Sequence, residues 1–503
     1  MKNNGYILGI DQGTTGTRTL ALNEKWEIES QGYYTHEQYY PKPGWVEHDP
    51  IEIWQKTQNS VSEALIKGGI NQKNLRAIGL DNQGETVIIW NKNNGKPIYN
   101  AIVWQDRRTS QLADELKEKH AKFIKEKTGV VVDSYFSALK IKWILDNVEG
   151  AREEAEKGNL IAGTTDTWLI WNMTNGKVHM TDYSTASRTM LLNINSKEWD
   201  KDILDLLNIP VKMLPELKNS SEVFGYTDPN SFLGLEIPIS GSAVDQQAAL
   251  FGQSCYKKGM IKTTYGTGCF MLMNTGNKIC NSDNGILSTV AWSLEDELTF
   301  ALDGGVYIAG AAVEWLNNGI NIIDNPAETE NICKSISNTG EVFFVPAFSG
   351  LAAPYWDQYA RGTLVGITGG TERKHIVRAT LESIAYQVND NMKVMEEDSG
   401  IDINVMRVDG GAVANDFLMQ FQADILGIPV DVPEITETTA LGAAYLAGLG
   451  IGVFDSIDQI SNNWSLKKRY EPKMSKTKRE YLIGRWKEAV ERSQGWAKKE
   501  ILE

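Results

Sequence analysis

The chain opens with an apolar stretch that ends abruptly at an acidic residue. Residues 6–10 are strand-like, Asp11 follows, and residues 13–17 are glycines and threonines. The alternation after this turn predicts two further short strands, over 18–22 and 26–29. The N-terminal pattern therefore predicts a three-strand meander wrapped around a glycine-threonine loop.

The same pattern recurs in the second half of the chain. Residues 260–264 predict a strand, 265–268 a glycine-threonine turn and 269–273 the returning strand. A supersecondary unit that recurs at such a long period is typical of a duplicated domain. We therefore expect two similar α/β domains, 1–253 and 254–503, each presenting its loop to a shared cleft.

Helical periodicity occurs between these meanders. It predicts amphipathic helices over residues 51–66, 136–147 and 415–426, the last closed by Gly427. Near the end, Thr477–Glu480 has the pattern of a capping box. We expect a terminal helix there, with one apolar face formed by Leu482, Trp486 and Val490.

Composition and charge narrow the possible functions. A chain of 503 residues with 42% hydrophobic content is long enough for two or three domains with ample core. The formal net charge of -15 disfavours nucleic-acid and anionic-membrane partners. Four cysteines without CxxC spacing indicate reduced, mostly buried thiols and no zinc site. The sequence shows no secretory leader and no membrane-length apolar run, so we expect a cytoplasmic protein with no membrane span.

The two loops offer what phosphoryl transfer requires from a protein: backbone donors, a metal and a carboxylate. Asp11 can hold Mg²⁺ through water. The turns at Gly13–Thr15 and Gly266–Gly268 can present N–H groups to phosphates from opposite sides, and Arg18 adds positive charge. A solvated hairpin turn is the simpler interpretation of either loop taken alone.

A second acid, Asp245, lies where a strand meets a helix. It is our candidate general base, and the alternative is an N-cap for the helix over 246–253. The turn Asp409–Gly411 precedes another helix, where glycine can leave room for a purine ring, although a plain tight turn also fits. P-loop and Rossmann fingerprints are missing, and hydrolase chemistry centred on histidine has little support with five histidines.

Several long segments together resemble the FGGY carbohydrate kinases, and within that family the branch that phosphorylates glycerol. The resemblance covers essentially the whole chain. It is carried by the segments 99–109, 135–147, 163–191, 245–253, 264–276, 345–357, 366–387 and 407–427.

The resemblance implies duplicated actin-like ATPase domains of the ribonuclease H-like type around a central cleft, with ATP and Mg²⁺ as cofactors. It also implies ATP-dependent phosphorylation of glycerol at a terminal hydroxyl. Asp245 and Arg18 take catalytic roles, and Asp11 and Asp245 are the expected metal residues. The phosphate and nucleotide residues are Asp11, Thr14, Thr15, Gly16, Arg18, Gly266, Thr267, Gly310, Gly411 and Asn415. The polyol residues are Gly84, Glu85, Trp104, Tyr135, Asp245, Gln246 and Phe270.

One residue departs from the pattern at the substrate site. Relatives that phosphorylate glycerol usually carry an arginine directly before the pocket glutamate, and this chain has Gly84 before Glu85. We therefore keep a second hypothesis, a kinase for erythritol, threitol, dihydroxyacetone or a similar polyol or ketose. A non-kinase actin-like ATPase is a third, more remote one.

The resemblance also bears on assembly and control. It implies a homo-oligomer, either a dimer or a tetramer. Some relatives bind a sugar bisphosphate through a loop with arginine, and others are activated by phosphorylation of a loop histidine. The corresponding segment here, 226–236, contains neither Arg nor His, so we expect neither form of regulation.

Overall fold

The N-terminal meander forms one half of a six-stranded mixed sheet and reaches one of its edges. The computed structural model describes residues 5–497. Strands β1 and β2 pair antiparallel around the loop, β3 extends the meander, and β5 and β14 add parallel to β1. The order in the sheet is β13 (Ser221–Tyr226), β14 (Pro238–Val244), β5 (Leu75–Asn82), β1 (Tyr6–Gln12), β2 (Gly16–Leu22) and β3 (Ile28–Thr35).

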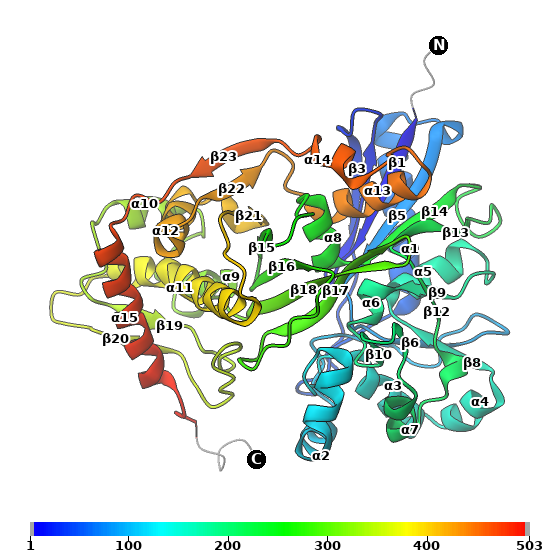
Figure 1. Cartoon of the computed structure of the whole chain (residues 1–503), viewed down its shortest axis with the longest axis horizontal. Helices are drawn as coiled ribbons and strands as arrows, with labels where there is room; N and C mark the ends of the chain where they lie inside the picture. Colours follow the sequence, from blue (N-terminus) through cyan, green and yellow to red (C-terminus); the bar gives the residue numbers. More distant parts are fainter. Residues whose placement is uncertain (1–4, 498–503) are drawn as a thin grey trace.

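A second mixed sheet contains the second meander. Strands β15 and β16 pair antiparallel, and β21 and β22 continue in parallel from β15. The order is β17 (Leu287–Leu294), β18 (Glu297–Val306), β16 (Cys269–Gly276), β15 (Ile261–Tyr265), β21 (Met406–Asp409), β22 (Val430–Pro433) and β23 (Leu466–Tyr470). Figure 1 shows the two sheets on opposite sides of the molecule.

The two sheets share one topology. The series β3-β2-β1-β5-β14-β13 corresponds, strand for strand and direction for direction, to β18-β16-β15-β21-β22-β23. The second sheet adds β17 at its edge. The duplication predicted from the recurring meander is confirmed; the boundary at 253/254 stays a prediction.

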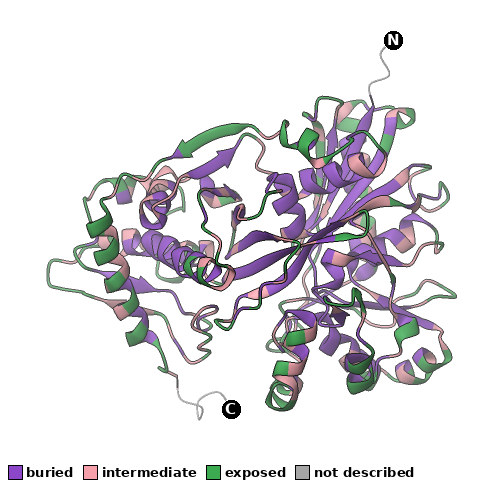
Figure 2. Cartoon of the chain, in the orientation of Figure 1, coloured by how far each residue is buried: buried purple, intermediate pink, exposed green. Residues whose placement is uncertain are grey.

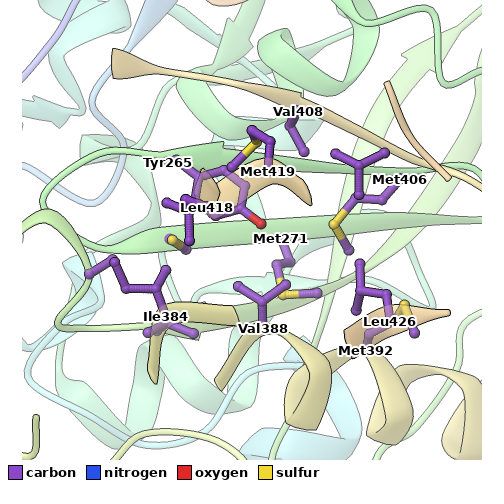
Figure 3. Close-up of a cluster of buried hydrophobic side chains, with 14 of the residues drawn as sticks. Tyr265, Met271, Ile384, Val388, Met392, Met406, Val408, Leu418, Met419 and Leu426 are labelled. Carbon is purple, nitrogen blue, oxygen red and sulfur yellow. The ribbon is translucent and has the colours of Figure 1, made fainter. Parts of the chain in front are cut away.

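Helices over 50–68 and 416–426 cover the sheets where the periodicity predicts them, whereas the long helix over 373–399 was not predicted. Helix α1 (Pro50–Gly68) starts at the N-cap Asp49 and packs on β2 and β3. Helices α11 (Arg373–Ser399) and α12 (Asp416–Leu426) pack with the second sheet around a methionine-rich core, shown in Figure 3. Figure 2 shows that the strands of both sheets are largely buried and that helix α15 has an exposed outer face.

The terminal helix starts earlier than its sequence predicts. Helix α15 (Lys476–Ser493) is capped by Ser475, whose side chain accepts a hydrogen bond from the N–H of Lys478. The capping box assigned to Thr477 is therefore wrong, because Thr477 already lies in the first turn. Trp486 and Val490 are fully buried and Leu482 packs beside them, as predicted.

A further packed region follows β5 in the first half. Helices α2 (Ser110–Thr128) and α3 (Ser137–Asn147) enclose an apolar core with β8 (Leu160–Gly163) and α7 (Lys201–Leu207). The remaining shorter strands are β4 (Glu47–His48), β6 (Ile88–Asn91), β7 (Ala101–Ile102), β9 (Met180–Asp182), β10 (Leu192–Asn193), β11 (Glu198–Trp199), β12 (Glu216–Lys218), β19 (Phe343–Val345) and β20 (Thr363–Val365). The remaining helices are α4 (Ala151–Lys157), α5 (Thr165–Met173), α6 (Tyr183–Ala186), α9 (Gly310–Glu314), α10 (Glu328–Lys334) and α14 (Ile457–Ser461).

Two helices connect the halves. Helix α8 (Asp245–Gly252) and helix α13 (Thr438–Gly450) pack against each other between the sheets (Figure 1). Although α13 belongs to the second half of the chain, it covers β1, β5 and β14 of the first sheet. A central apolar cluster therefore takes residues from both sheets, among them Ile7 of β1 and Leu272 of β16.

Three glycines allow this contact. Gly9, Gly79 and Gly241 are register partners on β1, β5 and β14. A Cβ at Gly9 would lie 2.1 Å from the carbonyl oxygen of Ala440, and one at Gly79 would lie 1.9 Å from that of Ala443. The backbone of α13 thus lies directly on a row of glycines, which we call the glycine row.

Two expectations about the whole chain can be checked here. Among residues 5–497, no helix is both long and apolar enough to cross a membrane. All four cysteines are buried and unpaired, as predicted.

We predict that Gly79→Ala strongly destabilises the protein. The new methyl group would collide with the α13 backbone, and overpacking of this kind typically costs about 1–3 kcal/mol or more. Urea unfolding of the variant measures the loss. Gly484→Ala is the matched control, because Gly484 lies in α15 with nothing within 4 Å of an added Cβ. At position 484 alanine should raise the free energy of unfolding by about 0.5–1 kcal/mol, because alanine has a higher helix propensity than glycine. Equal stability changes for the two variants would contradict this packing argument.

Candidate active site

Three carboxylates lie at the carboxyl edge of the first sheet. Asp11 on β1 and Asp81 on β5 are register partners, and β14 ends one residue before Asp245. Because β1, β5 and β14 run parallel, their carboxyl ends meet at one edge of the sheet. The sequence predicted Asp11 and Asp245 as site residues and missed Asp81.

Asp11 is a partly buried acid that lies beside Arg18. Burial raises the pKa of Asp11 to about 6, and the nearby Asp245 charge adds to the rise. A side-chain hydrogen bond with Asp81 and the positive charge of Arg18 lower the pKa in part. Arg18 is the register partner of Asp11 across β1 and β2. Its guanidinium donates to Gln31 at 2.7 Å and lies 5.1 Å from the ring centroid of Tyr33.

Asp245 is the first residue of α8. Val244 occupies the N-cap position, so the alternative interpretation of Asp245 as that cap is wrong. Its carboxylate does accept the N–H of Gln246 at 2.6 Å, which partly satisfies the helix terminus. Burial raises the pKa of Asp245, and the buried Lys262 of β15 is the largest opposing influence.

The first glycine-threonine loop is tied to the neighbouring aromatic residues. The N–H of Gly13 donates to the carbonyl of Gly16 at 3.0 Å, which closes the turn. The indole N–H of Trp104 donates to the Thr14 hydroxyl at 2.9 Å. Thr15 is exposed. The loop is therefore fixed at Thr14 and open at Thr15.

The second loop packs against the start of α9. The N–H of Gly310 donates to the carbonyl of Gly266 at 3.1 Å, and the N–H of Ala311 donates to that of Thr267 at 3.0 Å. A Cβ at Gly310 would lie 2.6 Å from the Gly266 oxygen, so this position requires glycine. Gly266 and Thr267 themselves are exposed.

The turn after β21 is a further exposed backbone segment. Gly410 has a φ of 91°, and a Cβ there would lie 2.4 Å from the carbonyl oxygen of Tyr265. Gly411 is exposed with nothing near its Cβ position. Asn415 caps α12 through the N–H of Leu418 and donates to Thr329 at 3.2 Å. Part of the role of Asn415 is therefore structural.

Three of the predicted polyol residues from the first half, Glu85, Trp104 and Tyr135, lie in one cluster. The rings of Trp104 and Tyr135 meet edge to face, with centroids 5.6 Å apart. Glu85 is buried and accepts from Arg188 Nε at 2.7 Å. Arg188 lies 5.8 Å from the Tyr135 ring centroid, which places acid, cation and aromatic in one cluster.

The second half supplies the other charges. Arg188 Nη1 lies 2.8 Å from Asp303 of β18, in an ion pair that lacks hydrogen-bond geometry. Lys262 donates to the side chains of Gln246 and Thr264. Phe270 pairs with Thr264 and Gly305 on the neighbouring strands. The Arg188–Asp303 pair thus joins opposite charges from the two halves of the chain.

Sequence reasoning missed Arg188, Lys262 and Asp81. Arg188 lies inside a segment that carries the resemblance, yet it follows a short helix with no motif of its own. Lys262 lies in β15, most of whose residues are polar, so nothing in the local sequence marked it as a buried charge. The only sequence feature that pointed to Asp81 as a site residue was its position near the carboxyl end of a strand.

Gly84 adopts a turn that favours glycine. Its φ is 62°, that of Glu85 is 32°, and its N–H donates to Asn82 Oδ1 at 3.1 Å. A Cβ at Gly84 would lie 2.7 Å from Val244 Cγ2. Gly84 and Glu85 both adopt left-handed backbone conformations, which turn the chain sharply. Such sparsely populated conformations are common at functional sites.

The acidic edge suits Mg²⁺ bound largely through water. Within residues 5–497, no group of three or more histidine, cysteine or acidic side chains is arranged to coordinate a metal directly. Mg²⁺ ordinarily keeps several waters and takes one or two carboxylates plus substrate phosphates. The partly buried Asp11 and Asp245 fit that requirement.

Comparison with known proteins decides the family. Residues 6–252 match the FGGY family of carbohydrate kinases, N-terminal domain, and residues 261–451 match its C-terminal domain. The chain belongs to this FGGY family. It is an ATP-dependent carbohydrate kinase, as the sequence predicted.

Relatives match over their full length. Glycerol kinase 2 of Thermotoga maritima is 58% identical over 495 residues, which cover 98% of this chain and 100% of that protein. Glycerol kinase 1 of Clostridium tetani is 55% identical, with 98% and 99% covered. The crystal structure of Plasmodium falciparum glycerol kinase with ADP is similar at 40% identity with a TM-score of 0.91, covering 97% of this chain and 98% of that one.

We predict that Glu85 makes the stability of this FGGY kinase depend on pH. Burial raises its pKa from 4.5 to about 7, although Arg188 opposes the rise. A raised acid pKa means that the folded state holds a proton which the unfolded state has released. The resulting stability is present below about pH 4.5 and is lost as the pH rises through about 7.

Urea unfolding at pH 4.5 and pH 8 tests this. Glu85→Gln should remove on the order of 1–3 kcal/mol of the pH dependence, while Glu118→Gln, at an exposed position of α2, should leave it unchanged. Identical pH profiles for wild type and Glu85→Gln would contradict the prediction.

Proposed function

We propose that this chain transfers the γ-phosphoryl group of ATP to a terminal hydroxyl of glycerol, forming sn-glycerol 3-phosphate. The observation that carries the proposal is the 58% identity to Thermotoga maritima glycerol kinase 2 over the whole of that protein. The cluster of Glu85, Arg188, Trp104 and Tyr135 supports it. A small polyol needs an aromatic wall for its C–H groups and charged partners for its hydroxyls.

Asp245 is the proposed general base. Its pKa is raised by burial, which increases its basicity, while the Lys262 charge favours the ionised form. Gln246 holds one end of the carboxylate through its N–H. Asp245 can therefore accept the proton of the attacking hydroxyl as the phosphoryl group transfers.

The two loops form the proposed phosphate clamp. Thr14, Thr15 and Gly16 face the phosphates from one side, Gly266 and Thr267 from the other, and Arg18 contributes its charge. Gly310, Gly411 and Asn415 line the nucleotide. Thr15, Gly266, Thr267 and Gly411 are exposed and Thr14 is held in place by Trp104, which fits loops that receive an anion. Bringing the loops together would exclude water from the γ-phosphate.

Asp11 and Asp245 would hold the Mg²⁺ that accompanies ATP. The ion supplies charge neutralisation between the phosphates when it is bound. Asp11 lies at the first loop and Asp245 on the polyol side, so together they would orient the γ-phosphate toward the acceptor. Homo-oligomerisation and a cytoplasmic location stay predictions.

The principal alternative is a kinase for another small polyol or ketose. Gly84 supports it, because the arginine that usually precedes the pocket glutamate is missing. A steady-state assay of ADP release over glycerol, dihydroxyacetone, glyceraldehyde, erythritol and pentitols separates the two. The glycerol proposal fails if another acceptor gives the highest kcat/KM. ADP release without any phosphorylated product would instead support the actin-like ATPase hypothesis.

We predict that Asp245→Asn folds normally and loses most turnover. Loss of a general base typically lowers kcat about 10²- to 10⁴-fold. Single-turnover transfer from ATP to glycerol measures the chemical step, and thermal unfolding checks the fold. A variant with near-normal kcat would rule out the base role.

We also predict that Gly84 sets acceptor specificity. A charged hydrogen bond contributes about 1.5–3 kcal/mol, so its absence weakens glycerol binding roughly 10- to 150-fold. Gly84→Arg should lower KM for glycerol and raise it for erythritol. Because a Cβ at position 84 meets Val244, the substitution is also made together with Val244→Ala. Val244→Ala alone is the control. An unchanged ratio of kcat/KM values across the panel would exclude Gly84 as the determinant.

A further inference from the structure

Arg188 is a buried cation with a donor that the protein leaves unused. The residue is 5% exposed, and its Nε donates to Glu85 at 2.7 Å. Its Nη1 lies 2.8 Å from Asp303 Oδ2 in a contact that lacks hydrogen-bond geometry, so Nη1 has no hydrogen-bond partner among residues 5–497. A buried donor without a partner is unfavourable, and such groups are rare unless a ligand or water completes them.

A second arginine shows how this protein completes a similar group. Arg378 is largely buried, and its Nε donates to Glu382 at 2.7 Å, the distance also found between Arg188 and Glu85. The Nη1 of Arg378, however, donates to two backbone carbonyl groups. The two arginines thus have the same kind of acidic partner at Nε and differ at Nη1, which has partners only in Arg378.

The unused donor of Arg188 lies beside the proposed acceptor pocket. The Arg188 guanidinium is 5.8 Å from the ring centroid of Tyr135. Burial raises the pKa of Tyr135 well above its usual range, and the charges of Glu85, Asp303 and Asp245 raise it further while Arg188 opposes them. These charges therefore act on one phenol that the proposed function assigns to the acceptor.

The other buried cations of the site have partners. Lys140 donates to two backbone carbonyl groups, one of them that of Tyr135. Lys262 donates to two neighbouring side chains. Position 84, directly before Glu85, is a glycine and supplies no side chain. Within residues 5–497, Arg188 is thus the cation of this site with a nitrogen that lacks a hydrogen-bond partner.

We propose that Arg188 and Asp303 together bind one acceptor hydroxyl that is not phosphorylated. This rests on the proposed function and deepens it, because it names the groups that recognise this hydroxyl. Nη1 would donate to the hydroxyl oxygen, and the hydroxyl would donate its proton to Asp303 Oδ2 beside it. A hydroxyl both donates and accepts, whereas a ketone carbonyl only accepts. The pair therefore favours a polyol over a ketose of the same length, and holds it from both halves of the chain.

Steady-state kinetics of the full chain with glycerol, dihydroxyacetone and ATP test the proposal. Arg188→Lys keeps a positive charge between the two acids and replaces the planar fork with a single ammonium group. It should raise KM for glycerol roughly 10- to 100-fold and leave KM for ATP within about twofold of wild type. Arg378→Lys is the matched control, which should lower Tm and leave both KM values nearly unchanged.

Asp303→Asn is the second variant, and it decides the outcome if Arg188→Lys does not fold. The substitution preserves the shape of the side chain and leaves Arg188 paired with Glu85. Its amide N–H can donate to a ketone carbonyl, which the carboxylate cannot. The ratio of kcat/KM for glycerol to that for dihydroxyacetone should therefore fall roughly 10-fold.

Three results would overturn the proposal. An unchanged KM for glycerol in Arg188→Lys, or an equal rise in KM for glycerol and for ATP, would show that Arg188 only joins the two halves. An unchanged ratio in Asp303→Asn would show that Asp303 does not contact the hydroxyl. The proposed function fails separately: if the wild type prefers another polyol, Arg188→Lys is tested with that polyol, and if it prefers a ketose, both proposals fail.

Discussion

Close contact between a helix and a sheet is the constraint on which this structure depends. Helix α13 comes from the second half of the chain and lies on β1, β5 and β14 of the first. The contact is possible because the glycine row removes three side chains at register-paired positions. Side chains on a strand alternate between faces, so Asp11 and Asp81 lie on the same face of the sheet as Gly9 and Gly79, two residues farther along. The packing that joins the halves therefore also fixes the acidic edge.

The charges of the site are completed only when the halves meet. Arg188 comes from the first half and contacts both Glu85 and Asp303, and Asp303 belongs to the second. Lys262 comes from the second half and contacts Gln246 of the first. Buried charges of this kind are strongly unfavourable unless partners are held in place. The charge distribution thus couples formation of the site to assembly of the two halves.

The two sheets share one topology but carry different groups at the carboxyl ends of their parallel strands. In the first sheet the parallel strands end in acids that face the proposed metal and acceptor, whereas the corresponding strand β21 ends in a partnered Asp409 and a glycine turn. The same backbone arrangement thus supplies acidic side chains in one sheet and an exposed glycine turn in the other. This division suits a reaction in which one partner carries phosphates and the other is a neutral polyol.

The sequence by itself determined the features that depend on local pattern. Alternating strands around glycine-threonine turns predicted both meanders and the duplication, Gly427 marked the end of a helix, and the long family segments predicted an FGGY kinase. Only the tertiary structure revealed that Asp81 lies beside Asp11, that Arg188 and Lys262 belong to the site, and that Val244 rather than Asp245 is the N-cap of α8. The physical reason is that a turn, a cap or a strand is set mainly by residues within a few positions of one another. The charge state and partners of a buried group are set by side chains that come together only when distant strands pair and the two halves pack.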